Sequence, residues 1–277
     1  MTILTFTLLI LAGAVVAGFL GSLTGLGGGV VIIPLLTLIF HVDIRYAIGA
    51  SLVASIATSS GSAAAYVKEG ITNMRLGMFL EIATTTGAIA GAFLAAYTPT
   101  HVVAIIFGLV LIFSAITSVQ KKTDHLETTS SPLARKLRLN STYPDEGKTV
   151  AYSLKNVPGG YLLMTVAGII SGLLGIGSGA LKVLAMDTVM HVPFKVSTTT
   201  SNFMIGVTAA ASAVVYLQRG YIEPGLALPV ITGVLAGSVL GSKLLVKAHT
   251  KSLRIVFCTV ISLLALEMIY NGLTGKI

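Results

Sequence analysis

The chain has 277 residues, of which 54% are hydrophobic and only 10% are charged, and its mean hydropathy is +0.91. Because soluble domains carry roughly 25% charged residues, this composition excludes a soluble globular protein and predicts a polytopic integral membrane protein. The formal net charge of +8 does not indicate nucleic-acid binding, since the basic residues lie in loops beside apolar runs, as the positive-inside rule expects.

The first predicted element is an apolar segment over about residues 3–22, which a glycine-rich stretch interrupts. No basic region precedes the segment and a copy of it appears later, so we expect a retained membrane segment rather than a signal peptide. The interruption reads SLTGLGGGVVIIP from Ser22 to Pro34, and a shorter apolar segment follows over about residues 30–40. Glycine costs about 1 kcal/mol relative to alanine inside a helix, so we expect the helix to break here.

Such a break offers hydrogen-bond donors to a ligand. A helix that restarts after it points unpaired N–H groups and a partial positive charge of order +0.5 into the gap, and glycine lets a ligand approach the backbone closely. The alternative is that the glycines only permit tight helix crossing. We interpret the break as a candidate anion site formed by the following residues: Thr24, Gly25, Gly27, Gly28 and Gly29.

Three full-length spans follow, near residues 46–67, 76–97 and 101–119. A polar linker then covers residues 120–160, and its lysines and arginines predict a cytoplasmic location. The linker is too short and too polar to build a sizeable core of its own. We therefore divide the chain into a first membrane repeat at 1–119, the linker at 120–160 and a second membrane repeat at 161–277.

The second half of the chain repeats the first at a constant offset of 150 positions, as from Gly18 to Gly168. The ungapped register predicts an apolar segment near 161–174, a second break, a short segment near 180–190 and spans near 196–217, 226–247 and 251–271. Two pairs in the repeat, Gly87 with Gly91 and Gly237 with Gly241, have the G-x-x-x-G spacing that lets helices pack closely in lipid.

Two topologies are open for the halves. If each broken first element crosses the membrane once, the halves are parallel; if it is a hairpin, they are inverted. The inverted arrangement places the basic cluster from Lys243 to Arg254 in the cytoplasm together with Lys68 and Arg75. We therefore predict an all-α protein of two homologous halves arranged as inverted repeats, each with a glycine-broken first element, although residues 3–22 are long enough to cross alone.

Polar residues inside the predicted spans complete the candidate site. Lys182 lies three residues after Gly179 in an apolar run, and an ionisable residue buried in a membrane marks a functional site. Its charge suits an anion; snorkelling or pairing with Asp187 is the alternative. Hydroxyl and amide groups can replace water around an anion, although they also bond to helix carbonyls. The other candidates are Ser51, Gly177, Ser178, Gly179, Ser201 and Asn202, with Glu81 as a candidate proton carrier.

The two breaks resemble those of a known family. GFLGSLTGLGGGVVIIPLL at 18–36 and GIISGLLGIGSGALKV at 168–183 are similar to the sulfite exporter TauE/SafE family, also called the 4-toluene sulfonate uptake permease family. The resemblance covers essentially the whole chain. It implies transport of a sulfur-containing or organic anion, such as sulfite, sulfoacetate, thiosulfate or a sulfonate, across a prokaryotic inner membrane. Ser178 and Lys182 replace Gly28 and Ile32 of the first motif, so the halves need not contribute equally.

Two other classes of protein remain as alternatives to a transporter. A membrane subunit of a larger complex would explain the spans but not the duplicated breaks. An intramembrane serine protease would need a glycine at Ile176 before Gly177-Ser178-Gly179 and a histidine in a later span. We expect no cofactor, no metal and no nucleic-acid partner, whereas the anion, the direction of transport, the coupling ion and the oligomeric state stay open.

Overall fold

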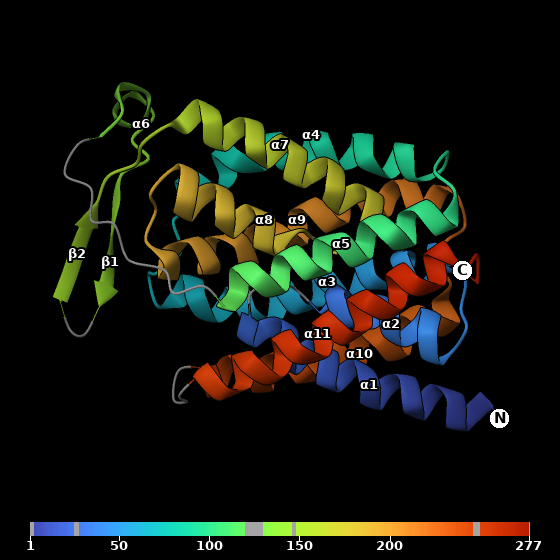
Figure 1. Ribbon diagram of the computed structural model, residues 1–277. Helices are drawn as coiled ribbons and strands as arrows, with labels where there is room; N and C mark the ends of the chain where they lie inside the picture. The colour runs from blue at the N-terminus through green and yellow to red at the C-terminus, as the bar shows by residue number, and fades with distance from the viewer. Residues whose placement is uncertain (1–2, 25–27, 120–129, 146–147, 246–249, 277) are drawn as a thin grey trace.

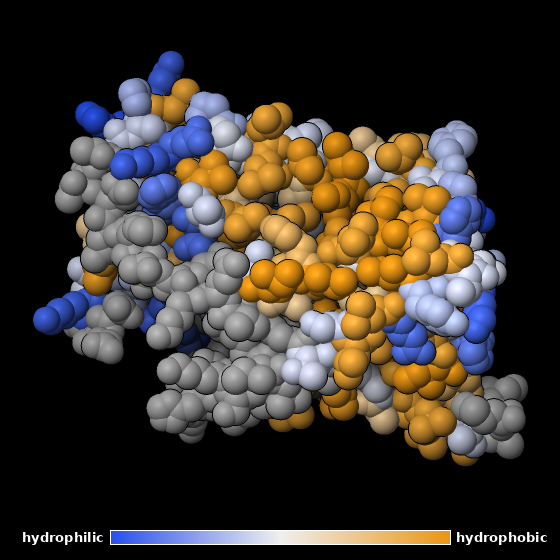
Figure 2. All heavy atoms as spheres, viewed as in Figure 1, coloured by the Kyte–Doolittle hydropathy of each residue, from blue (hydrophilic) through white to orange (hydrophobic). Residues whose placement is uncertain are grey.

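The computed structural model describes residues 3–24, 28–119, 130–145, 148–245 and 250–276. Within these residues, seven helices are long and apolar enough to cross a membrane. Apolar side chains form a broad belt on the face shown in Figure 2, between polar regions at the two ends of the molecule. Such a belt is the surface that lipid covers, and the chain is therefore a multi-pass membrane protein.

The helices follow the order expected from the sequence. The first half contains α1 (Ile3–Thr24), α2 (Gly29–Pro34), the π-helical η1 (Leu35–Ile39), α3 (Ile44–Lys68), α4 (Met74–Ala95) and α5 (Thr100–Val119). The second half contains α7 (Val157–Leu174), α8 (Gly179–Leu184), the π-helical η2 (Ala185–Val189), α9 (Phe194–Gln218), α10 (Pro224–Leu245) and α11 (Thr250–Leu273). From α2 to α4, each element begins and ends 150 positions before its counterpart between α8 and α10.

The two halves interleave, because α1 packs along α10 and α7 packs along α4 (Figure 1). Glycines make these contacts close. A Cβ added at Gly87 of α4 would overlap the carbonyl oxygen of Thr165 in α7. At the equivalent place in the other pair, a Cβ at Gly237 of α10 would overlap the carbonyl oxygen of Val15 in α1. The interpretation of the G-x-x-x-G pairs as packing motifs is therefore confirmed.

The same contacts give the relative directions of the helices. On α7, Gly168 faces Thr84 and Gly172 faces Ala88, so residue numbers rise together and α4 and α7 are parallel. In Figure 1, α1 runs from the N-terminus at the right toward the left, whereas α7 runs from left to right. The first helices of the two halves therefore point in opposite directions, and both chain ends lie at the end of the molecule opposite the linker.

The linker corrects the all-α prediction. It contains a short helix, α6 (Pro132–Lys136), and an antiparallel hairpin of β1 (Ser141–Asp145) and β2 (Lys148–Tyr152). Tyr143 and Tyr152 are each 3% exposed and belong to one apolar cluster with Leu76 and Leu80 of α4. The hairpin is possible because the linker uses apolar surface of the membrane helices instead of building a core alone.

Asn73 ties this hairpin to the helical bundle. Its Nδ2 donates to the carbonyl oxygen of Leu139 at 2.9 Å and to the Tyr152 hydroxyl at 2.8 Å. Its Oδ1 accepts from the N–H of Leu76 at 3.1 Å and so caps α4. The backbone N–H of Asn73 donates to Thr200 Oγ1 of α9 at 3.1 Å. One residue at the start of α4 therefore fixes the linker and α4 through its side chain and α9 through its backbone.

Candidate functional site

The break between α7 and α8 lies entirely inside the protein, since every residue from 171 to 180 is buried. Gly175 and Gly177 both have φ of +68°, and Ser178 has φ of +44°, a region that glycine adopts without strain. The N–H of Gly175 donates to the carbonyl oxygen of Ser171 at 2.8 Å and ends α7. Ser178 Oγ donates to the carbonyl oxygen of Ala167 at 2.7 Å and holds the turn against α7.

Of the break before α2, the structure describes Gly28 and Gly29, while the predicted site residues Gly25 and Gly27 and the side chain of Thr24 lie outside the described residues. A Cβ added at Gly28 would lie 2.8 Å from Thr58 Oγ1, and one at Gly29 would lie 2.8 Å from Ser55 Oγ. Side-chain hydroxyls of α3 thus pack directly against both glycines.

Ser51 of α3 lies between the two breaks. Its Oγ donates to the carbonyl oxygen of Gly175 at 2.7 Å, and a Cβ at Gly29 would overlap the same Oγ. The equivalent Ser201 of α9 donates to the carbonyl oxygen of Gly179 at 3.2 Å. Both serines therefore give their hydroxyl protons to carbonyls at the second break.

Lys182 is fully buried in α8, with 0% of its surface exposed. Its ammonium donates to Thr208 Oγ1 of α9 at 2.5 Å. An ammonium has three donors, and this is the one that finds an acceptor within the described part of the chain. The side chain neither snorkels to an interface nor pairs with Asp187, so both alternative interpretations of Lys182 are wrong.

Thr208 also forms a hydrogen bond with Glu81 of α4, a residue of the other half. Its hydroxyl donates to Glu81 Oε1 at 2.6 Å, and Thr85 Oγ1 donates to the same oxygen at 3.1 Å. Glu81 is 8% exposed, and its second oxygen, Oε2, has no hydrogen-bond partner among the described residues. The buried cation and the buried carboxylate are thus joined through one hydroxyl group.

Three further polar groups of the α3, α7 and α9 helices are buried without a partner in the described residues: Ser55 Oγ beside Gly29, Ser171 Oγ near the end of α7 and Asn202 Nδ2 of α9. The backbone oxygen of Asn202 accepts from Ser59 Oγ at 2.5 Å, so α3 and α9 are joined beside the free amide. A buried donor without an acceptor costs about 1–3 kcal/mol. Groups of this kind, retained inside a membrane protein, favour a polar ligand at this place.

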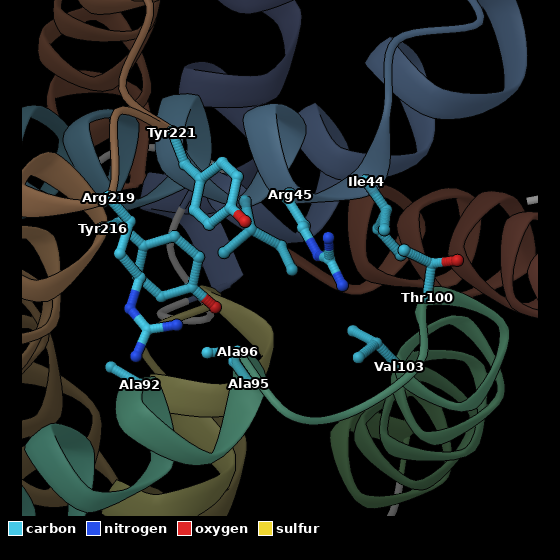
Figure 3. Close-up of a pocket in the computed structure, with 11 residues that line it drawn as sticks. Ile44, Arg45, Ala92, Ala95, Ala96, Thr100, Val103, Tyr216, Arg219 and Tyr221 are labelled. Carbon is cyan, nitrogen blue, oxygen red and sulfur yellow. The ribbon is translucent and has the colours of Figure 1, made fainter.

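A pocket opens at the end of the molecule where α3 begins and α9 ends, and two arginines and two tyrosines line it (Figure 3). The guanidinium of Arg45 lies 5.9 Å from the Tyr221 ring centre, and that of Arg219 lies 5.9 Å from the Phe93 ring centre. Neither arginine forms an ion pair within the described residues. Ile48 forms part of the lining and also faces Gly175, where an added Cβ would lie 2.5 Å from Ile48 Cγ2.

Thr208 and the two arginines were not predicted from the sequence. Thr208 lies in an apolar helix, where a threonine commonly bonds to the carbonyl oxygen one turn earlier. Its hydroxyl does lie 3.0 Å from the carbonyl oxygen of Met204. Arg45 and Arg219 flank predicted spans, where basic residues are usual. The repeat contained a signal for Arg219. Tyr216 matches Tyr66 in the first half, whereas Arg219 stands where the first half has the acidic Glu69, so the charge at this position differs between the halves.

Comparison with known proteins gives a consistent result. The model of the family described as sulfite exporter TauE/SafE matches residues 9–268. The chain is 30% identical over 279 residues to "Probable membrane transporter protein YunE" of Bacillus subtilis, covering 98% of this chain and 99% of that protein. It is 26% identical over 282 residues to "Probable membrane transporter protein MJ0441" of Methanocaldococcus jannaschii, covering 96% of each. No solved structure matches the chain at a significant level.

Proposed function

Because this chain belongs to the sulfite exporter TauE/SafE family, we propose that it is a secondary transporter of a small sulfur-containing or organic anion. The substrate class is sulfite, thiosulfate, a sulfonate or sulfoacetate, and the membrane is the prokaryotic inner membrane. The observation that carries the proposal is Lys182, a fully buried cation in a membrane helix with donors left over after its bond to Thr208. Ionisable residues in such positions mark substrate pathways.

The anion binds between the two glycine breaks in this proposal. Lys182 and the free amide of Asn202 supply donors from the second half, and Ser55 supplies a hydroxyl from the first. The first N–H groups of α2 and α8 add partial positive charge. Glycine at positions 28 and 29 lets the start of α2 pack directly on the hydroxyl groups of α3, since a Cβ at either would meet a hydroxyl oxygen.

Inverted repeats provide the mechanism for alternating access. The opposite directions of α1 and α7 and the reciprocal packing of α1 on α10 and α7 on α4 support an inverted arrangement. In transporters of this kind the substrate lies near the middle of the membrane between broken helices, and one repeat moves against the other. The basic linker is then cytoplasmic by the positive-inside rule, and the pocket of Arg45 and Arg219 opens to the outside.

Solute exchange by the purified protein tests this function. The full-length chain is reconstituted in vesicles loaded with unlabelled sulfite, thiosulfate, sulfoacetate or 4-toluenesulfonate, and entry of the labelled anion is measured. We expect exchange of at least one of these anions, and Lys182→Gln should raise the apparent KM roughly ten- to hundredfold, because a hydrogen bond to a charged group contributes about 1.5–3 kcal/mol.

Two further variants make the test of Lys182 specific. Lys182→Arg keeps the charge with a wider, planar donor set, so we expect affinity between that of the wild type and that of Lys182→Gln. Lys68→Gln is the matched control, since Lys68 is exposed at the end of α3, and it should leave the KM unchanged. Unaltered affinity in a folded Lys182→Gln protein would remove Lys182 from the site, and absence of exchange of all four anions would overturn the proposed substrate class.

A further inference from the structure

Glu81 is an unusual group for the place it occupies. It lies in the first half of the α4 span Met74–Ala95 and is 8% exposed. Oε1 accepts two hydrogen bonds, from Thr208 and Thr85, whereas Oε2 is buried without a partner among the described residues. Anion transport does not by itself need a carboxylate next to the binding cation. A carboxylate with one satisfied and one open oxygen can take up a proton without losing its existing bonds.

Glu81 shares its surroundings with few other charges. In the sequence of α7, which packs along α4, no charged residue occurs, and Tyr161 lies beside Phe79, two residues before Glu81. In α9 no charged residue occurs between Lys195 and Arg219 near its two ends. Arg75 lies in the first turn of α4, and Asp187 of η2 already interacts with another group. Lys182 is therefore the charge to which Glu81 is coupled, through Thr208.

This coupling has a consequence when an anion arrives. Without a substrate, one buried positive charge faces one buried negative charge across a hydroxyl group. An anion bound to Lys182 places a second negative charge near Glu81, and like charges in a medium of low dielectric constant disfavour each other strongly. Proton uptake by Glu81 removes that repulsion. Anion binding thus favours protonation, and by thermodynamic linkage protonation favours anion binding to the same degree.

We propose that Glu81 is the proton-binding site that couples this transporter to protons, so that one proton and the anion cross the membrane together in the same direction. The proton comes from water on the side where the anion binds, rests on the carboxylate of Glu81 and returns to water on the other side. This inference rests on the proposed function and adds the coupling ion to it. Lys182 binds the anion, Glu81 binds the proton, and Thr208 connects them.

The experiment separates exchange from coupled accumulation in vesicles containing the full-length protein. The probe is labelled thiosulfate, which does not titrate near neutral pH, and the membrane voltage is clamped with potassium and valinomycin. We expect the wild type to accumulate thiosulfate against its gradient when the vesicle exterior is acidic, up to about tenfold for each pH unit. A trapped pH dye should report proton entry that depends on thiosulfate.

Glu81→Gln keeps the size of the side chain and its bond to Thr208 but cannot carry a proton. In this variant thiosulfate exchange should persist, whereas accumulation driven by the pH gradient and the dye signal should both disappear. Glu81→Asp should retain both. The matched control is Glu267→Gln, because Glu267 is an acidic residue of α11 that is exposed, and it should behave as the wild type.

The outcomes distinguish the two proposals. No exchange of any of the four sulfur anions by the wild type overturns the proposed function and the coupling with it. Exchange of thiosulfate without pH-driven accumulation or a dye signal in the wild type overturns the coupling alone. Accumulation by Glu81→Gln equal to that of the wild type removes Glu81 as the proton site. If Glu81→Gln fails to fold, the wild-type dye signal and the behaviour of Glu81→Asp still decide the question, as loss of coupling in a folded Glu81→Asp protein contradicts it.

Discussion

At the scale of single residues, the polar groups of this protein divide into those that hold the backbone and those left with unused donors. Ser51, Ser178 and Ser201 were candidates for binding, yet each gives its proton to a carbonyl oxygen of the α7–α8 region. Lys182 and Asn202 keep donors that no described residue accepts. The three serine hydroxyls therefore build the frame of the site, while Lys182, Asn202 and the unpartnered Ser55 hydroxyl are left for a ligand.

Arg45 and Arg219 give the first prediction at this scale. Both line the pocket in Figure 3, and a negative substrate that approaches from this side passes their positive potential first. Because the groups are partly exposed, Arg45→Gln or Arg219→Gln should raise the apparent KM only about two- to fivefold, with the maximal rate unchanged. The effect should shrink as salt is added. Rates of anion exchange at several concentrations and ionic strengths provide the measurement.

Lys276 offers a matched control for these arginines. It lies at the C-terminal end, is exposed and has its ammonium 5.5 Å from the Tyr270 ring centre. Lys276→Gln removes a charge from the same end of the molecule but not from the pocket, so the KM should not change. Equal effects of Lys276→Gln and Arg219→Gln would show that net charge, and not the pocket, attracts the anion.

At the scale of elements, the close crossings of α1 with α10 and of α4 with α7 should be equally sensitive to a single methyl group. An added Cβ at Gly87 or Gly237 overlaps a backbone oxygen, which cannot move aside as a side chain can. We expect Gly87→Ala and Gly237→Ala each to lower stability by about 1–3 kcal/mol, measured as loss of the folded fraction on denaturation in detergent.

Gly225 is the control for these crossings. It lies in the first turn of α10, and the nearest atom to an added Cβ is Glu223 Oε1 at 3.9 Å. Gly225→Ala should be neutral or stabilise slightly, since alanine reduces the freedom of the unfolded chain. A stability loss at Gly225 as large as that at Gly237 would mean that helix crossing is not the cause.

The docked linker gives a prediction that depends on pH. Burial raises the pKa of the Tyr152 hydroxyl to about 12, from its ordinary value of about 10. The protonated hydroxyl is favoured in the folded state, so its contribution to stability is complete below about pH 10 and is lost as the pH rises toward about 12. We expect protease cleavage in the hairpin to increase over this range.

Tyr152→Phe separates this titration from a general alkaline effect. The variant removes the acceptor of Asn73 Nδ2, which should weaken docking at neutral pH by about 1–3 kcal/mol and abolish the part of the pH dependence that Tyr152 causes. Tyr97, which is 82% exposed, supplies the control, and Tyr97→Phe should retain the wild-type profile. An identical profile in Tyr152→Phe would contradict the role given to this hydroxyl.

The linker also shows what sequence reasoning could and could not predict. Hydropathy and the 150-residue offset predict the order and length of the membrane helices, because lipid selects each span by its own composition. They do not predict which helices touch, so the contact of Glu81 with Thr208, from separate halves, was not foreseen. The hairpin was missed for a related reason, since Tyr143 and Tyr152 become buried only against α4.

At the scale of the whole molecule, the arrangement of charges and the crossing of the halves point to the same topology. The linker elements α6, β1 and β2 lie at the end of the molecule opposite the two chain ends (Figure 1). The pocket with Arg45 and Arg219 lies at the end where the termini are, and the proposed site around Lys182 lies between. A path from the pocket past Ile48 to the second break would therefore cross from one membrane surface into the middle of the protein.

The inverted arrangement makes a direct prediction about equivalent positions of the two halves. Lys68 and Gln218 end α3 and α9, are 150 positions apart and are both exposed. If the halves are inverted, these residues lie on opposite membrane surfaces, whereas in parallel halves they lie on the same one. In a Cys258→Ala background, an impermeant maleimide should label Gln218→Cys on intact cells and should label Lys68→Cys only after the membrane is opened.

Two reference positions fix the orientation in this experiment. Lys148→Cys, in β2 of the basic linker, should be protected on intact cells if the linker is cytoplasmic, and Lys276→Cys, near the C-terminus, should be labelled. Protection of Gln218→Cys together with labelling of Lys68→Cys would keep the inverted halves but reverse the protein in the membrane. Labelling of both equivalent positions from the same side would contradict inverted repeats, and alternating access would then require a different motion.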